Sequence, residues 1–233
     1  MTGPACSDDQ AFENQLALEH AALVGRLAAG ISHDLNNPLA AILGFAQAIR
    51  IDLDRGEALT PDSLRGDLET IEQQAVRASD LVRDLLELAR PFRAVANAAP
   101  TRLEPVVRQA MRLVDYAAQR VQSTLDLEVD ERGESIAAMV DVGRLRHLLV
   151  ELMHEAILAT DRGAVRVEIE ADAAAQQALV RFVASPASSC VSEPGDKAVV
   201  IARELAGRMG GAIQVDQPES GVATFTLCLP GAS

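Results

Sequence analysis

The segment SHDLNNPLAAILGF, residues 32–45, places a histidine, an acid and an amide inside an otherwise apolar, periodic stretch. Asp34 follows His33 directly, and Asn37 lies four residues on, which stacks it one turn along the same face of a helix. A neutral imidazole can act as a nucleophile through one ring nitrogen while a carboxylate holds the N–H of the other. His33 is therefore a candidate nucleophile, with Asp34 as that carboxylate and Asn37 placed to hold a water or a phosphoryl oxygen.

Pro38 sets this histidine apart from an ordinary one. A proline inside a helix costs about 3 kcal/mol, because it removes a backbone hydrogen bond and clashes with the preceding turn. Pro38 cannot donate to the carbonyl oxygen of Asp34, so we expect the helix to bend beside the ring of His33. An ordinary surface histidine, which accounts for His20, needs no such proline. Gly44, further along, lets another surface come close.

Two other kinds of site do not fit these residues. No second His, Cys or carboxylate lies three or four residues from His33 to complete a set of metal ligands. No Ser/His pairing points to a hydrolase triad. The sequence therefore predicts neither a metal nor a cofactor at this site.

The composition excludes several classes of protein. The 233 residues carry a formal net charge of −13 without a basic run, which argues against nucleic acid and anionic membrane as main partners. The hydrophobic fraction of 48% supports a folded core. Cys6, Cys190 and Cys228 form no CxxC pair, as expected in a reducing cytosol. Because the chain shows neither a signal-peptide pattern nor a run of 18 uncharged apolar residues, we expect a cytoplasmic protein without a membrane span.

The candidate site falls on a helix predicted over residues 11–53. Its apolar positions alternate at spacings of four and three, which is typical of a helix packed in a bundle. These positions are Val24, Ala28, Ile31, Leu35, Pro38, Ile42, Phe45 and Ile49. In this register Ile31 and Leu35 point inward, so we expect His33 to point into solvent.

A second helix is predicted over residues 62–90, after the glycine- and proline-containing break DRGEALTPDS. Thr60 before Pro61 fits an N-cap, and Pro91 ends the helix. Two helices cannot bury such apolar seams alone, so we expect two copies of the hairpin to form a dimeric four-helix bundle. The alternative is that the hairpin packs on the rest of its own chain.

The rest of the chain predicts an α/β sandwich. Residues 94–101, AVANAAPT, are typical of a linker between a bundle domain over 1–93 and a second domain over 102–233. In the second domain, helices are predicted over 102–120, 142–160 and 197–209. Strands are predicted around 125–129, 136–140, 165–169, 178–184, 212–216 and 223–229. This order gives a mixed sheet with three helices on one face.

The stretch GISHDLNNPLAAILGF resembles the H-box of two-component sensor histidine kinases. QQAVRASDLVRDLLELARP is similar to the second helix of the family's dimerisation and phosphotransfer domain. VDVGRLRHLLVELMHEAILAT and IARELAGRMGGAIQVDQPESGVATFTLCLP resemble the start and end of its GHKL-type, Bergerat-like ATP-binding domain. The resemblance implies that His33 is the phospho-acceptor, that Asp34 is its acid/base partner and that Asn37 positions water when a response regulator is dephosphorylated.

The motifs that hold ATP in that family are degenerate in this sequence. Glu151 of the ELxxNA motif is kept, but Glu155 replaces the asparagine that helps to hold magnesium. Residues 183–190, VASPASSC, contain neither the aspartate that reads adenine nor the glycines that follow it. The phosphate-binding turn keeps Gly195 as its one glycine, and Asp196 would repel a triphosphate. The flexible lid between these motifs is also missing.

These changes imply that the fold is kept while ATP binding is lost. Glu151 and His154 are then surface or packing residues, and His147 is an ordinary helix residue. We therefore predict a kinase-derived histidine phosphotransferase, whose His33 carries a phosphoryl group to or from a response-regulator aspartate. The alternatives are an autokinase with a divergent ATP pocket, against which the degenerate motifs argue, and a non-catalytic dimeric module that sequesters or dephosphorylates a response regulator.

The exposed face below His33 is the predicted docking surface for a receiver domain, together with the second helix. It carries Ala40, Ala41, Gly44 and Gln47. Three of these four residues are small, so a helix of the receiver could pack closely against this face.

Overall fold

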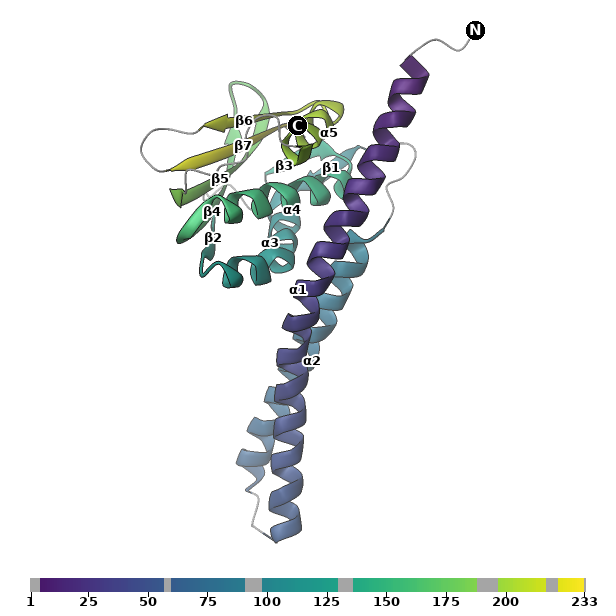
Figure 1. Ribbon diagram of the computed structural model, residues 1–233. Coiled ribbons are helices and arrows are strands. Elements are labelled where there is room, and N and C mark those ends of the chain that lie inside the picture. The colour runs from purple at the N-terminus through teal and green to yellow at the C-terminus, as the bar shows by residue number, and fades with distance from the viewer. Residues whose placement is uncertain are drawn as a thin grey trace.

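A helical hairpin forms the first part of the chain in the computed structural model, which describes residues 5–56, 60–90, 98–129, 136–187, 197–216 and 222–232. Helix α1 spans Ala5–Arg55 without interruption, and α2 spans Pro61–Leu88. Thr60 caps α2 as predicted, since its side chain accepts a hydrogen bond from the backbone N–H of Ser63 at 3.2 Å. Figure 1 shows the hairpin as a long rod with the rest of the chain beside its upper half.

An α/β region follows the hairpin. Its elements are β1 (Ala99–Arg102), α3 (Leu103–Arg120), β2 (Thr124–Val129), β3 (Ala137–Val140), α4 (Val142–Leu158), β4 (Thr160–Asp172), β5 (Gln177–Ala187), α5 (Lys197–Arg208), β6 (Ala212–Asp216) and β7 (Ala223–Pro230). Five strands form one sheet in the order β2-β4-β5-β7-β6. The pair β2–β4 is parallel and the other pairs are antiparallel, which confirms the predicted mixed sheet.

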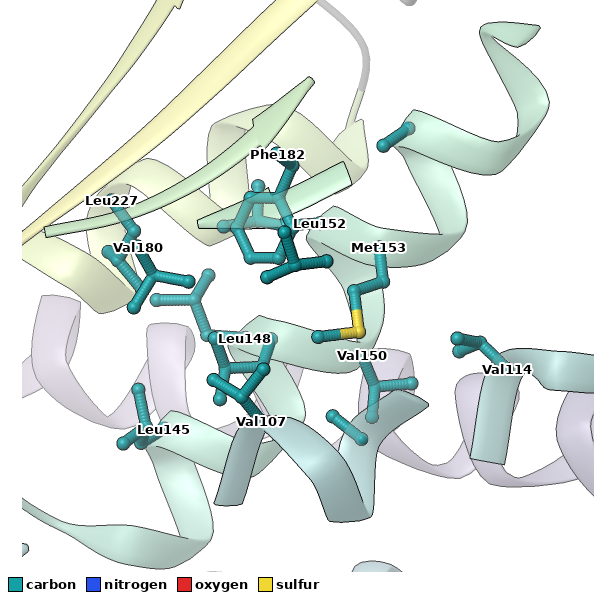
Figure 2. Close-up of a cluster of buried hydrophobic side chains, with 14 of the residues drawn as sticks. Val107, Val114, Leu145, Leu148, Val150, Leu152, Met153, Val180, Phe182 and Leu227 are labelled. Carbon is teal, nitrogen blue, oxygen red and sulfur yellow. The ribbon is translucent and has the colours of Figure 1, made fainter. Parts of the chain in front are cut away.

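Alternation along the strands decides which face of the sheet is buried. In β4, Val165, Val167 and Ile169 are fully buried, whereas the residues between them point the other way. On that outer face Arg181 of β5 donates to Glu168 at 3.0 Å. The inner face packs on α4, and Figure 2 shows Leu148 and Leu152 of α4 beside Val180, Phe182 and Leu227 of the sheet. The period of two in the sequence thus predicts the core of this region correctly.

The predicted linker differs from the structure at its C-terminal end. Strand β1 begins at Ala99 and pairs with β3, so the prediction of a linker is wrong over residues 99–101. Pro100 fits this place because its fixed φ suits an extended strand and β1 belongs to a sheet of two strands, where one missing N–H donor is tolerated. Residues 94–97 of the predicted linker lie outside the described residues.

No helix in the described ranges combines the length and the apolar character that crossing a membrane requires.

Candidate functional site

The ring of His33 projects from α1 into solvent, with 62% of its side chain exposed. The side chain of the neighbouring Asp34 is mostly buried, with 10% of it exposed. His33 Nδ1 lies 3.7 Å from Asp34 Oδ1, so a small rotation of the exposed ring would bring the two atoms within hydrogen-bond distance. The structure therefore places an accessible imidazole against a buried carboxylate, in the orientation that the helical register predicts.

The pKa of Asp34 is raised from its usual value. Burial is the largest cause and the negative charge of Asp115 on α3 is the next. The hydrogen bond and charge of His33, and the charge of Arg77 on α2, act in the opposite direction. Asp34 is thus a carboxylate whose ionisation depends on charges from three helices.

Asn37 is exposed one turn further along α1, on the side of His33. Pro38 is buried within α1 and leaves the carbonyl oxygen of Asp34 without the N–H donor that an ordinary residue would supply. The structure therefore brings together His33, Asp34 and Asn37, which the sequence singled out.

The predicted docking face is open in the structure. Ala40, Gly44 and Gln47 are exposed, and Ala41 is partly buried. A Cβ atom added at Gly44 would meet no atom within 4 Å. The described residues of this face therefore leave room for a partner.

Glu151 lies on α4, where the sequence predicts a surface or packing position. It is 6% exposed, and Arg26 of α1 donates from Nη2 to both of its carboxylate oxygens, at 3.0 and 3.3 Å. Burial raises the pKa of Glu151 to about 7, although the charge of Arg26 acts against this shift. Because 46% of the Arg26 side chain is exposed, its charge is screened and burial dominates.

His20 and His147 form a second contact between α1 and α4. Their Nδ1 atoms are 3.3 Å apart and their ring centroids 5.3 Å apart, with exposed fractions of 7% and 2%. Burial lowers the pKa of both rings, that of His147 to about 3. The prediction of a surface role for His20 is therefore wrong. The reason is that the upper part of α1 carries a second buried seam, formed by Leu16, His20, Leu23 and Leu27.

A third contact joins Glu13 of α1 to Arg144 of α4, with Arg144 Nη2 2.9 Å from Glu13 Oε1. We call these three pairs, Glu13–Arg144, His20–His147 and Arg26–Glu151, the α1–α4 clasp. Between α1, α4 and α5 the clasp leaves a cavity of only about 10 Å³, lined in part by Glu19 and Ile201. A gap of this size holds about one water molecule.

The remaining residues of the predicted ATP pocket are only partly described. Glu155 and His154 are partly buried on α4, and burial lowers the pKa of His154. Gly195 and Asp196 lie outside the described residues. Among the residues that the structure does describe, no three His, Cys, Asp or Glu side chains are grouped as a metal site requires.

A larger cavity, of about 460 Å³, adjoins Asp34 at the junction of the hairpin with α3 and β2. Arg77 of α2 and Asp115 of α3 also line it. The sequence predicts a role for neither residue, because no pattern in a single sequence shows which residues of α1 and α3 lie close together. Arg26 has no signal in the sequence for the same reason, since its partner Glu151 lies 125 residues away. The seam of His20 was visible in the sequence, since Leu16, His20 and Leu23 keep spacings of four and three.

Comparison with known proteins bears on both parts of the chain. Residues 23–91 match the family model of the His Kinase A (phospho-acceptor) domain. The C4-dicarboxylate transport sensor protein DctB of Rhizobium meliloti is 27% identical over 229 residues, covering 91% of this chain and 35% of that protein. The sensor histidine kinase ZraS of Salmonella typhi is 25% identical over 221 residues, covering 89% and 46%. The chain thus spans about a third to a half of the length of these two relatives.

Solved structures show the same fold at lower identity. The histidine kinase AdeS of Acinetobacter baumannii superimposes with a TM-score of 0.50 and 15% identity, over 86% of this chain and 98% of that one. Histidine kinase ThkA, solved in complex with response regulator protein TrrA, gives a TM-score of 0.50 and 21% identity, over 96% and 66%. These structures show the fold alone, whereas the family match and the sequence relatives indicate a His Kinase A domain followed by a kinase-like region.

Proposed function

We propose that this chain of the sensor histidine kinase family, with a His Kinase A domain followed by a kinase-like region, is a histidine phosphotransferase. His33 carries a phosphoryl group to or from the aspartate of a response-regulator receiver domain. The kinase-like region keeps its fold but does not bind ATP.

The accessible ring of His33 against the buried Asp34 is the observation that carries this proposal. With its proton on Nδ1 held by Asp34, neutral His33 presents the lone pair of Nε2 to a partner. Nε2 forms a bond to the phosphorus of an aspartyl phosphate while the bond from phosphorus to the acyl oxygen breaks. The receiver leaves with a free carboxylate, and Asp34 stabilises the positive charge that the ring acquires. The reverse step returns the phosphoryl group.

The α1–α4 clasp supports the absence of ATP chemistry. Glu151, the glutamate of the ELxxNA motif, is engaged by Arg26 of α1 rather than open to a ligand. The cavity beside it, about 10 Å³, is far smaller than the roughly 300 Å³ or more of an ordinary ligand pocket. The small size of this cavity therefore supports our proposal that the region binds no nucleotide.

The lower part of the hairpin supports a homodimer. Leu39, Leu43 and Leu68 are 53%, 58% and 47% exposed in a single chain. A second copy of the hairpin would bury them and complete a four-helix bundle. The receiver would dock on the face of Ala40, Ala41, Gly44 and Gln47.

Mass mapping tests the phosphotransfer. The protein is mixed with a panel of receiver domains phosphorylated by acetyl phosphate, and we expect the phosphoryl group on His33. His33→Gln should abolish the transfer and leave folding unchanged, because an exposed ring leaves no cavity when it is replaced. Transfer at wild-type levels in His33→Gln would refute the assignment.

Asn37 favours a second activity, dephosphorylation of the receiver. Its exposed amide lies one turn from His33 and could orient an attacking water. Asn37→Ala should leave transfer to His33 working if the protein is chiefly a relay. If the protein is chiefly a phosphatase, the same substitution should stop the loss of phosphate from the receiver.

Calorimetry with Mg-ATP separates this proposal from an autokinase. We expect no binding in the micromolar range. A low-micromolar dissociation constant, together with labelling of His33 from ATP, would show instead that the protein is an autokinase.

A further inference from the structure

The cavity of about 460 Å³ joins the candidate site to the kinase-like region. Asp34 of α1 contributes one wall. Its other charged lining residues are Arg77 and Asp80 of α2 and Arg112 and Asp115 of α3, while β2 contributes only Leu125. Charges from two helices, α2 and α3, therefore face the carboxylate that lies beside His33.

Two of these charged groups are engaged away from Asp34. Arg112 Nε donates to Asp84 Oδ2 at 2.6 Å, and Asp80 forms an ion pair with Arg83. Asp115 accepts a hydrogen bond from Gln119 Nε2 at 2.8 Å, and because this donor is a neutral amide it does not cancel the charge of Asp115. Asp115 and Arg77 are thus the charges of opposite sign that act on Asp34 across the cavity.

We infer that Asp115 and Arg77 are positioning residues for the chemistry at His33, acting through Asp34 across the cavity that all three residues line. The inference rests on the proposed function, because it concerns the nucleophile of that reaction. Asp34 must be ionised to accept the Nδ1–H of His33, which leaves Nε2 as the attacking atom. Its side chain is only 10% exposed, so nearby charges are screened less than at an open surface.

The two residues act in opposite directions. Asp115 raises the pKa of Asp34, after the larger effect of burial, and Arg77 lowers it, together with the adjacent His33. Because Asp115 lies on α3, the inference gives the kinase-like region a part in the chemistry of His33 that needs no nucleotide. Undocking this region would remove Asp115 and solvate Asp34, and both changes favour the ionised carboxylate.

Asp115→Asn and Arg77→Gln test the inference. Asparagine keeps an oxygen for the hydrogen bond from Gln119, so Asp115→Asn changes mainly charge. The matched controls are Asp216→Asn on β6, at the opposite edge of the sheet from β2, and Arg203→Gln on α5. Both control residues are exposed and neither lines the cavity.

The first readout is the carbon chemical shift of the Asp34 carboxyl group, followed against pH in each full-length variant. We expect its titration to move to lower pH in Asp115→Asn, to higher pH in Arg77→Gln, and to stay in place in both controls. This measurement needs no partner and no phosphate. An unchanged titration in both test variants, or shifts of the opposite sign, would overturn the inference even if His33 is phosphorylated normally.

The second readout is the rate at which inorganic phosphoramidate labels His33. Nε2 forms the bond to phosphorus while the bond from phosphorus to nitrogen breaks and ammonia leaves. At the pH where the wild-type rate is half its maximum, Asp115→Asn should label faster and Arg77→Gln more slowly. Both differences should vanish when Asp34→Asn is also present, and their persistence in that background would contradict an action through Asp34. If the wild type is not labelled at all, the proposed function fails while the titration still decides the inference.

Discussion

The upper and lower parts of the hairpin have the same kind of apolar seam but bury it differently. In the upper part Leu16, Leu23 and Ile31 are buried to 1% exposure or less and belong to one core with the α/β region. From Leu39 to Asp80, which includes the turn of the hairpin, none of the described side chains is fully buried. The upper part of the seam is covered by the same chain, whereas the lower part stays at least partly exposed among the described residues.

The structure confirms one predicted solution, packing on the rest of the same chain, for the upper part, and the dimeric bundle stays a prediction for the lower part. The alternative in which the hairpin packs on the rest of its own chain holds for the upper part. A second copy would be needed only where the α/β region does not reach (Figure 1). His33 and Asp34 lie at the boundary, so the site can contact both the kinase-like region and an incoming partner.

Leu43→Asp should break the lower part most strongly. If a second copy covers this seam, the substitution buries a charge in an apolar interface, and the dimer dissociation constant should rise by about a hundredfold or more. Sedimentation velocity over a range of concentrations measures it. Val200→Asp on α5 is the control, since Val200 is also half exposed but lies on the kinase-like region. A dimer as tight as wild type in Leu43→Asp would place the interface elsewhere.

Leu23→Ala should destabilise the upper part by about 3 kcal/mol, because it leaves a cavity in a fully buried site. The loss should not depend on protein concentration, since the partner surface belongs to the same chain. Leu43→Ala should instead weaken the protein more as it is diluted. Urea unfolding at two concentrations compares the two variants, and a concentration-dependent loss in Leu23→Ala would show that the upper seam also needs a second copy.

Arg26→Met should destabilise the α1–α4 clasp by roughly 1–3 kcal/mol, because it leaves the buried carboxylate of Glu151 without its donor. Adding Glu151→Gln removes that charge, and the double variant should recover much of the loss. Chemical denaturation combined with hydrogen exchange along α4 follows both effects. No recovery in the double variant would mean that Arg26 acts by packing alone.

The pH dependence of the clasp should be the smallest effect, because two groups oppose each other. His147, with its pKa lowered from 6.5 to about 3, takes up a proton only in the unfolded chain below about pH 6.5, so the free energy of unfolding falls as the pH falls. Glu151 has its pKa raised from 4.5 to about 7, so the folded chain takes up this proton at a higher pH than the unfolded chain. The free energy of unfolding therefore rises as the pH falls from 7 to 4.5.

Single variants separate these two contributions. Between pH 7.5 and 5.5, His147→Gln should lose less stability than the wild type, and Glu151→Gln should lose more. Urea titrations at the two pH values measure the difference. Equal slopes in the two variants would show that neither group titrates in the clasp.

The sequence predicts well whatever depends on local spacing. The exposure of His33 follows from the positions of Ile31 and Leu35, and the strands of the sheet follow from alternation. The seam through Val24 and Ile31 predicts a surface position for His20, which is wrong because the helix carries a second buried seam. Arg26–Glu151 has no local signal, since 125 residues separate its partners. The cavity beside Asp34 depends on how α3 docks, which no spacing within one helix can predict.

The unbroken course of α1 has a mechanical consequence. Its 51 residues make a rod of about 75 Å, at about 1.5 Å per residue. Arg26 and His33 are seven residues, or about two turns, apart and both precede Pro38, so they belong to the same stiff segment. Twisting that segment about its axis turns His33 and Arg26, which contacts α4 of the kinase-like region, through one common angle. A rotation of α1 that changes the direction of the His33 ring therefore also strains the hydrogen bonds between Arg26 and Glu151.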